Sequence, residues 1–457
     1  MVDVQVIGTG AAELAAALEL AEVGLRIRVS PAPGDDEAWA ALPSSGVADP
    51  DSALRGFLAH VAAPLAEGGP GVPAADPVES PIKPVLLRSS RGEWVPQPTP
   101  EVLGIPAVPM SADTLAVLGG GASTRAYLDR VKPLLTIGKT RSVGALVQSR
   151  MGKGALERLV EPIVRERYGV SAADVDMAIA APGLNEDLTV IGTLSGAVLA
   201  YAERDVARET HVRPAGGWAA LREALLARLA LYEVEFTEQP VVDARHAVEG
   251  WTIVSERGVE GTVGALVVGV DPFGGELPGL AGDLGELSPR SARLRVRAAI
   301  EDPGLPEMDP ARDALDALEV ADTGGTGAPW SVRLGSDGAG GWFAEATSAA
   351  TPYAAPTAGA VQGRHATARE LEWATAAIGH AEARLSGAGL DSHRAVAPYV
   401  TTEERDAEAS RLAVWRAARD ETLPVGPALH GGDLAAAIAD ARSAAIALRR
   451  RLTGIAD

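Results

Sequence analysis

Alternating apolar and polar residues open the chain. Val2–Ile7 alternates in this way up to Gly8, which is typical of a strand that ends in a turn. Ala11–Val23 is rich in Ala, Leu and Glu and contains no β-branched run, so it predicts a helix that ends at Gly24. Leu25–Val29 alternates again. The first 30 residues therefore predict a strand–turn–helix–strand unit.

Strands and helices alternate toward both ends of the chain, with a helical block between them. Apolar residues recur at helical spacing across Arg141–Tyr168, while residues 31–80 are rich in Pro and Gly and predict loops. Further helices are expected at Ser52–Leu65, Trp218–Leu231, Ala366–Leu385, Asp406–Ala418 and Leu434–Leu452. Further strands are expected at Val234–Phe236, Val241–Asp243, Trp251–Ser255, Ala265–Val270, Ser291–Ile300, Trp330–Leu334 and Trp342–Ala344. This pattern predicts a two-lobed α/β protein.

Composition narrows the classes of function. The 457 residues are enough for two or three domains, and a net charge of −20 argues against nucleic-acid binding. The chain has no cysteine, and its seven histidines are scattered without the spacing of a metal-binding helix, so no metal site is predicted. No signal peptide or membrane span is visible in the sequence. We expect a cytoplasmic protein, with peripheral membrane association left open.

The strongest local motif is Gly8-Thr9-Gly10-Ala11-Ala12-Glu13, between the first strand and the first helix. In a dinucleotide-binding turn, the first two glycines allow a tight turn and a close approach of pyrophosphate, and a third allows close packing of the helix. Glu13 stands in place of the third glycine, and Ser30-Pro31 replaces the acidic residue that would bind a ribose. The motif therefore predicts either a dinucleotide site or a βαβ unit that binds no nucleotide.

Several longer segments share a pattern with one enzyme family, in the same order along the chain. They are Arg88–Pro96 with Leu103–Pro106, Ser142–Gly152 with Leu159–Val164, Arg213–Leu221, Val267–Pro272 and Leu429–Ala445. The most specific is Ser142–Gly152, because it matches the family pattern S-V-G-E-F-V-R-R-R-x-G along much of a helix. On these residues the chain resembles the protoporphyrinogen/coproporphyrinogen oxidases, which are oxygen-dependent flavoproteins of the amine-oxidase superfamily.

The resemblance implies a two-lobed flavin amine-oxidase-like fold, in which a Rossmann-type FAD lobe is assembled from separated segments. These segments are residues 1–84, 206–285 and 401–457, with a mainly helical substrate lobe at 85–205 and its β part at 286–400. The implied activity is FAD-dependent oxidation of a porphyrinogen in haem biosynthesis, either coproporphyrinogen III or protoporphyrinogen IX. FAD would carry out the redox chemistry, and the protein would position the tetrapyrrole.

The resemblance also implies a set of site residues. Contacts to FAD are expected from Gly8, Gly10, Glu13, Val241, Val242, Gly431 and Gly432. Arg88 or Arg91 would bind a carboxylate of the tetrapyrrole, because arginine binds carboxylates in a bidentate manner; the alternative is that both are solvated loop charges. No residue is assigned to acid–base catalysis, and no oligomeric state is predicted.

Several positions depart from the family pattern, and they support a second hypothesis. Glu13, Pro31 and Asp433 replace residue types expected around FAD, and the family's arginine–diglycine stretch has no match in Pro31–Gly46. Asp433 also suits the N-cap of the helix that follows it. These departures favour a flavin-free, catalytically inactive paralogue that binds a tetrapyrrole or a partner protein. A third hypothesis, an oxidase of amines or carotenoids, is disfavoured by the helical block.

Overall fold

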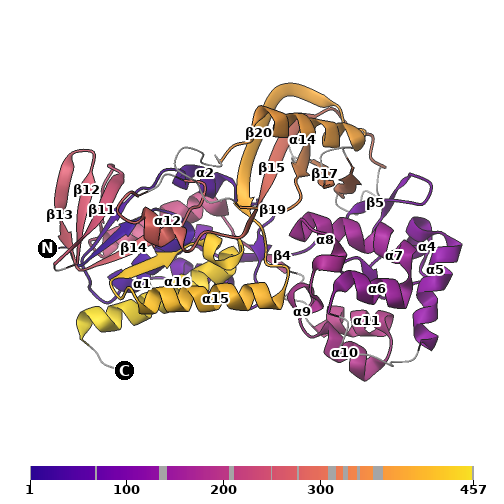
Figure 1. The fold of residues 1–457 in the computed structure, drawn as a ribbon, viewed down its shortest axis with the longest axis horizontal. Helices are drawn as coiled ribbons and strands as arrows, with labels where there is room; N and C mark the ends of the chain where they lie inside the picture. Colours follow the sequence, from indigo (N-terminus) through magenta and orange to yellow (C-terminus); the bar gives the residue numbers. More distant parts are fainter. Residues whose placement is uncertain are drawn as a thin grey trace.

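The computed structural model describes residues 2–66, 69–132, 141–204, 210–248, 250–274, 277–306, 315–322, 328–336, 340–353 and 364–454. Across these residues the protein has two lobes and a large sheet that lies toward the top of the view in Figure 1. One lobe contains a parallel sheet covered by helices, and the other is a block of short helices. The two-lobed α/β architecture expected from the sequence is confirmed.

The parallel sheet has the strand order β10–β2–β1–β14–β21. Its strands are β1 (Val4–Ile7), β2 (Ile27–Ser30), β10 (Glu235–Phe236), β14 (Ala265–Gly269) and β21 (Thr422–Val425). The central strand β1 is buried along its whole length, because the layers on both faces of the sheet exclude water. All carboxyl ends of these strands lie at one edge, where the chain leaves each strand for a turn.

Helices cover one face of the parallel sheet, and a small antiparallel sheet covers the other. Every residue of α1 (Ala11–Ala21) is buried, because this helix lies between the sheet and the long C-terminal helix α16 (Leu434–Thr453). The other helices of this lobe are α2 (Asp35–Ala40), α3 (Ala53–Ala62), α12 (Gly217–Leu231), α13 (Ala281–Gly285) and α15 (Thr402–Ala417). The antiparallel sheet consists of β11 (Val241–Ala247), β12 (Gly250–Ser255) and β13 (Gly258–Val263). A second small sheet has the order β3 (Val47–Ala48), β9 (Thr210–Pro214) and β4 (Pro77–Pro81).

The helical block has its own apolar core, and serine side chains begin two of its helices. Ser111 accepts a hydrogen bond from the backbone of Thr114, and Ser142 accepts one from Ala145, as N-caps do. The helices are α4 (Ala112–Leu118), α5 (Gly120–Tyr127), α6 (Val143–Met151), α7 (Lys153–Ala155), α8 (Glu161–Tyr168), α9 (Met177–Ala180), α10 (Leu184–Ile191) and α11 (Leu194–Arg204), with the 3₁₀ segment η2 (Leu128–Val131). Among the described residues, no helix has both the length and the apolar character needed to cross a bilayer.

The large sheet joins the two lobes. Its strand order is β19–β15–β18–β17–β16–β5–β6, with β20 paired to β15. The strands are β5 (Leu86–Arg88), β6 (Trp94–Pro96), β15 (Ser291–Ile300), β16 (Ala317–Ala321), β17 (Trp330–Ser336), β18 (Trp342–Thr347), β19 (Thr351–Pro352) and β20 (Leu385–Val396); the short hairpin β7 (Glu101–Val102) and β8 (Ile105–Pro106) lies apart. Helix α14 (Ala368–His380) covers one face of this sheet. The helix predicted across Ala366–Leu385 is therefore shorter than expected, and the strand β20 follows it.

Candidate functional site

The glycine-rich turn lies at the carboxyl edge of the parallel sheet. Gly8 follows β1 with a φ of 113°, a conformation that favours glycine, and α1 begins at Ala11. β14 runs beside β1, with Ile7 opposite Val268, and it ends at Gly269. Because β2 pairs with the opposite side of β1, the chain connections run in opposite directions from the point between β1 and β14. Open α/β sheets bind ligands in the crevice at such a point.

The side chain of Glu13 occupies this crevice. Glu13 is only 8% exposed, although it lies in the first turn of α1. A methyl group added at Gly10 would lie 2.5 Å from Oε2 of Glu13, and one at Gly8 would lie 3.2 Å from its Cγ. A methyl group on Gly269 would overlap Oε1 of the same carboxyl group. Glu13 therefore fills the space that the glycines leave between the two strand ends, where a pyrophosphate would approach.

Asp35 binds the donors of the same turn from the first residue of α2. One oxygen of its carboxylate accepts hydrogen bonds from the backbone N–H of Thr9 (2.7 Å), from the Thr9 hydroxyl (2.9 Å) and from the backbone N–H of Ala32 (2.8 Å). Trp39 donates its indole N–H to the carbonyl of Thr9 at 2.8 Å, and Arg222 donates to the Thr9 hydroxyl at 3.1 Å. The protein's own carboxylate thus takes the donors that a nucleotide phosphate would use.

The charges around the turn are unfavourable for another anion. Burial, together with the nearby negative charges of Asp35 and Asp271, raises the pKa of Glu13 to about 8. At neutral pH the Glu13 carboxyl is therefore mostly protonated, whereas Asp271 is ion-paired with Arg364. A diphosphate entering this site would face these carboxyl groups and would displace Asp35 from Thr9.

The N-terminus of α16 is also capped from within the chain. Asp433 accepts a hydrogen bond from the backbone N–H of Ala436 at 2.9 Å, so its expected role as an N-cap is confirmed. Gly431 and Gly432 have φ values of 61° and 78° and form the turn into the helix, with Gly431 packed closely against Tyr399. Burial raises the pKa of Asp433. A second helix N-terminus at the carboxyl edge thus has its own carboxylate in place.

A cavity of about 230 Å³ lies beside this turn, between α15 and α16. Burial alone would raise the pKa of Asp440, but hydrogen bonds from Arg416 and His430 hold it below its usual range. The residues that line the cavity are Tyr399, Arg405, Ala409, Leu412, Ala413, Arg416, Leu429, His430 and Asp440. Pockets for drug-sized ligands occupy roughly 300 Å³ or more, so this cavity is too small for a flavin dinucleotide.

The described residues do not fit FAD. Asp35 and Glu13 occupy the phosphate-binding turn, and Asp433 caps the second helix. Ser30, at the position where an acid would bind a ribose hydroxyl, accepts hydrogen bonds from Gln5 and Thr237, both at 2.9 Å. At these three places a side chain of the protein occupies the position where a dinucleotide would bind.

The two valines predicted to contact FAD lie at the start of β11. Val241 is buried and packs in one cluster with Ile7, the residue before Gly8, whereas the side chain of Val242 is exposed. Val241 is thus placed behind the glycine-rich turn, on the side of the sheet opposite α16. A contact between either valine and a cofactor stays a prediction.

The two predicted substrate arginines lie on the large sheet, far along the chain from the turn. Arg88 on β5 is ion-paired with Glu319 at 3.2 Å and Glu382 at 2.7 Å, and its guanidinium stacks 3.9 Å from the ring centre of Trp94. Arg91 lies on the exposed turn between β5 and β6. Neither is brought to the glycine-rich turn by the contacts described, and their role in binding a substrate stays a prediction.

A different set of cations lies on the face of the large sheet turned away from α14. We call it the arginine face; its basic residues are Arg293, Arg295, Arg297, Arg333 and His393, and the acidic residues Glu345 and Asp391 lie among them. Along β15 the arginines alternate with Leu294 and Val296, which pack in the core beneath α14.

The arginine face is turned toward the helical block. Arg293 is buried and donates hydrogen bonds to the backbone carbonyls of Arg165, Glu166 and Arg167 at the end of α8, at 2.8–3.2 Å. Burial lowers the pKa of Arg293 to about 10. Arg333 is ion-paired with Glu166 at 2.6 Å. These contacts fix one end of the face and join the sheet to the helices.

Arg295 and His393 differ from these anchored residues. They face each other across β15 and β20, and burial together with the charge of Arg295 lowers the pKa of His393. Among the described residues, no carboxylate lies within ion-pair distance of Arg295 or Arg297, and Arg297 instead stacks 3.9 Å from the ring centre of Phe343. Glu345 on β18 and Asp391 on β20 lie opposite Arg297 on the same face, so the arginine face also carries negative charge, and Arg295 is the arginine that makes no ion pair and has no carboxylate directly opposite it among the described residues.

Sequence reasoning missed Asp35 and Arg295. The signal for Asp35 was a Gly34-Asp35-Asp36 run where the family has an arginine–diglycine stretch, but its partner Thr9 is 26 residues away. The signal for Arg295 was the alternation Arg293-Leu294-Arg295-Val296-Arg297, which predicts a strand with one basic face. Among the described residues, no cluster of histidine and acidic side chains could hold a metal ion.

Comparisons with known proteins identify the fold. No protein family and no curated sequence matches this chain. A structure from Exiguobacterium, provisionally assigned as a protoporphyrinogen oxidase, is similar with a TM-score of 0.66 and 14% identity, over 98% of this chain and 99% of that one. A reduced UDP-galactopyranose mutase matches with a TM-score of 0.55 and 13% identity, over 100% and 96% of the two chains.

A third solved structure supports the same conclusion about the fold. Cyclohexylamine oxidase from Brevibacterium oxydans matches with a TM-score of 0.50 and 15% identity, over 99% of each chain. At these identities the likeness concerns the fold alone. The chain has a flavin amine-oxidase-like α/β fold, as the sequence predicted, with a parallel sheet and additional sheets.

Proposed function

We propose that this chain is a flavin-free binding protein built on the flavin amine-oxidase fold, and that its ligand is a tetrapyrrole. The observation that carries the first part is the occupation of the glycine-rich turn by Asp35 and Glu13. A fold can lose the chemistry of its relatives while it keeps their architecture. Here the carboxyl groups of Asp35 and Glu13 occupy the positions where the cofactor's phosphates would bind, so the turn needs no nucleotide to satisfy the donors of Thr9.

The choice of a tetrapyrrole rests on the segments that resemble the porphyrinogen oxidases and on the arginine face. A porphyrinogen carries propionate carboxylates, which arginine binds better than lysine does. Arg295 has positive charge without a carboxylate partner among the described residues, and the ring of Phe343 lies beside Arg297 on the same face. We infer that the propionates bind at Arg295 and that the macrocycle packs against the neighbouring sheet and helices.

The test is a titration of the purified full chain with coproporphyrin, followed by the change in its visible absorption. We expect saturable binding that Arg295→Gln weakens roughly tenfold, because one charge-assisted bidentate contact is lost. The matched control is Arg91→Gln, on the exposed turn between β5 and β6, which should change the affinity less than twofold. An absence of binding, or an equal loss in both variants, would contradict the assignment of the ligand.

A second candidate is an FAD-dependent porphyrinogen oxidase in haem biosynthesis, which is what the resemblance implies. The observation in its favour is the similarity over 98% of the chain to the structure provisionally assigned as a protoporphyrinogen oxidase. This candidate requires FAD to displace Asp35 from Thr9 and Glu13 from the crevice. Oxygen-dependent oxidation of coproporphyrinogen by the purified chain with added FAD would favour it over the flavin-free protein.

A further inference from the structure

One face of the helix α15 lines the cavity of about 230 Å³, which includes no residue of the glycine-rich turn or of the arginine face. Residues three and four positions apart share one side of a helix. The residues of α15 on this side are Arg405, Ala409, Leu412, Ala413 and Arg416. Ala409 and Ala413 are exposed and lie at the rim, so a ligand can enter from solvent.

The inner part of the cavity is apolar. Leu412 is 6% exposed and Leu429 is 8% exposed, and both belong to the small core beneath α15. The Tyr399 hydroxyl donates to the carbonyl of Leu429 at 2.9 Å. Burial, together with nearby carboxylates, raises the pKa of Tyr399 to about 12, so this hydroxyl stays protonated. An apolar cavity of about 150 Å³ is enough to bind benzene, so this interior has room for one substituted ring.

The polar side of the cavity is fixed by one carboxylate. Asp440 accepts hydrogen bonds from both terminal nitrogens of Arg416, at 2.9 and 2.7 Å, and from Nε2 of His430 at 3.1 Å. Arg416 also donates to the carbonyl of Pro424 on β21 at 2.8 Å. These contacts hold Arg416 in place before a ligand binds, which lowers the entropy that binding costs.

One donor of this fixed guanidinium group has no partner. The Nε of Arg416 is buried and makes no hydrogen bond within the part of the chain that the structure describes. Buried donors without an acceptor are uncommon in proteins, because such a group loses its contact with water and gains nothing in return. An acceptor oxygen on a bound molecule would satisfy it.

The charges that line the cavity favour an acidic ligand. Among the described lining residues, Arg405 and Arg416 are two cations against the single carboxylate of Asp440. Arg405 is ion-paired there with its exposed neighbour Asp406, and an exposed pair of this kind contributes little. Arg405 can therefore turn from Asp406 to a ligand at low cost.

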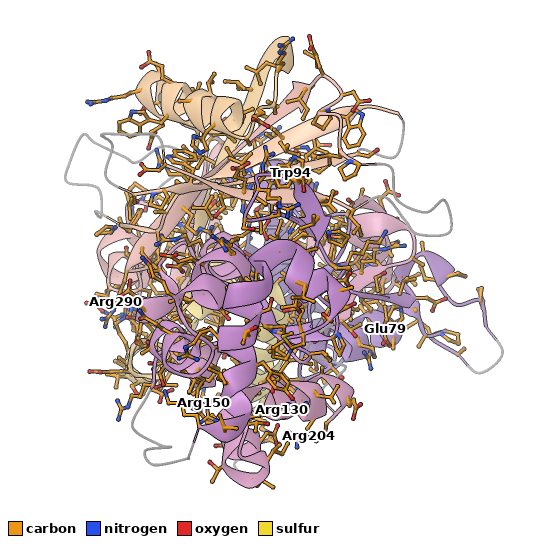
Figure 2. The ribbon with its side chains drawn as sticks, turned by 90° about the vertical axis from the view of Figure 1, so that its right-hand side faces the viewer. Glu79, Trp94, Arg130, Arg150, Arg204 and Arg290 are labelled. Atoms are coloured by element: carbon orange, nitrogen blue, oxygen red, sulfur yellow. The ribbon has the colours of Figure 1, made fainter. Side chains whose placement is uncertain are left out.

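The buried acid of α15 has partners of its own. Glu408 precedes Ala409 and is ion-paired with Arg290 at 2.6 Å and with Arg411. Figure 2 shows Arg290 at the left edge of the molecule, well apart from Trp94 of the large sheet. Because the charge of Glu408 is neutralised within the protein, it offers little opposition to an anion in the cavity.

We propose that this cavity binds a small organic acid, with its carboxylate at Arg405 and Arg416 and an apolar body of about one ring against Leu412 and Leu429. Small-molecule sites combine an apolar interior with a few placed polar groups, and arginine is well suited to carboxylates. The cavity supplies both. The site shares no residue with the arginine face, so it does not depend on the tetrapyrrole proposed there.

The first test is a titration of the purified full chain with benzoate, followed by saturation-transfer NMR of the ligand. We expect saturable binding of benzoate, and roughly fivefold weaker binding of the neutral analogue benzamide, which has no charge to pair with Arg405. Arg405→Gln should weaken benzoate binding roughly fivefold and leave benzamide binding within about twofold. The matched control is Arg257→Gln, on the exposed turn between β12 and β13, which should change neither affinity.

A second pair of variants tests the cavity itself. Ala413→Phe should fill the cavity from its rim and abolish benzoate binding. The matched control is Ala407→Phe, at an exposed alanine of the same helix that does not line the cavity, and it should bind benzoate as the wild type does. Thermal unfolding will show whether each variant folds, and Arg405→Gln keeps the test valid if Ala413→Phe does not.

Three results would overturn the proposal. They are no saturable binding of benzoate to the wild type, equal affinities for benzoate and benzamide, and equal losses in Ala413→Phe and Ala407→Phe. Equal affinities would show that the cavity selects an apolar body and not an acid.

Discussion

The glycine-rich turn and the arginine face differ in how their charged and polar groups are paired. At the turn, the carboxylate of Asp35 satisfies the donors of Thr9, and the carboxyl group of Glu13 fills the crevice between two strands. On the arginine face, Arg295 makes no ion pair among the described residues and lies opposite Thr347 and His393. Donors that are already paired within the protein are not free to bind a ligand, whereas an arginine without an ion pair is. On the proposed function, we therefore expect a ligand at Arg295 on the large sheet and none at the turn.

The largest expected effect concerns Glu13 and the pH dependence of stability. In the folded protein its pKa is raised from 4.5 to about 8, mainly by burial. Between these values the folded state binds the proton and the unfolded state releases it, so the free energy of unfolding decreases as pH rises. The slope from this group is at most about 1.4 kcal/mol per pH unit, and it disappears above pH 8.

Glu13→Gln should remove this slope. Denaturant unfolding of the wild type and the variant from pH 5 to pH 9 should show that the variant gains stability relative to the wild type as pH rises, up to about pH 8. The same relative stability at every pH would mean that Glu13 is ionised and solvated in the folded protein. The crevice would then be open, and the contrast with the arginine face would be lost.

The next effect concerns the hydrogen bonds of Asp35. Asp35→Ala would leave the backbone N–H groups of Thr9 and Ala32 without their acceptor, and an unsatisfied buried donor costs about 1–3 kcal/mol. We expect the free energy of unfolding to fall by a similar amount. The matched control is Asp36→Ala, at an exposed neighbour whose contact is an ion pair with Arg222, and a surface pair contributes about 0–1 kcal/mol. Equal losses in denaturant unfolding of the two variants would contradict the role of Asp35 in the turn.

A smaller effect separates Arg88 from Arg295. Arg88→Gln removes two ion pairs that are partly exposed and a contact with Trp94, so we expect a loss of about 1–2 kcal/mol in the free energy of unfolding. Its affinity for coproporphyrin should stay within about twofold of the wild type, since this is the change expected of an arginine without a ligand contact. A tenfold weaker titration with unchanged stability would instead move the substrate contact from the arginine face to Arg88.

Much of the fold could be predicted from the sequence because its signals are local. The strand, turn and helix up to Ala21 follow from alternation, Gly8 and a run of good helix formers, and Asp433 was recognisable as an N-cap beside its helix. The strand β20 was missed because residues 385–396 contain two glycines and show no regular alternation; its pairing with β15 determines its conformation.

The site was harder to predict because its contacts are not local. The sequence identified Glu13 as an unusual residue, but it could not show that its carboxyl group lies against Gly269, which is far along the chain. Arg88 fitted a family pattern, yet its partners Glu319 and Glu382 come from distant segments. Such pairs depend on how the two lobes and the large sheet pack together. The spacing of residues within one segment carries no information about that packing.

The most direct test of the central claim is the visible absorption spectrum of the purified full chain after incubation with excess FAD and desalting. Because Asp35 and Glu13 occupy the phosphate-binding turn, we expect no flavin bands after desalting and no change in the melting temperature with FAD. Stoichiometric flavin bands that survive desalting, together with a raised melting temperature, would contradict the account. They would show that the turn opens to admit the cofactor and would favour the second candidate, the FAD-dependent oxidase.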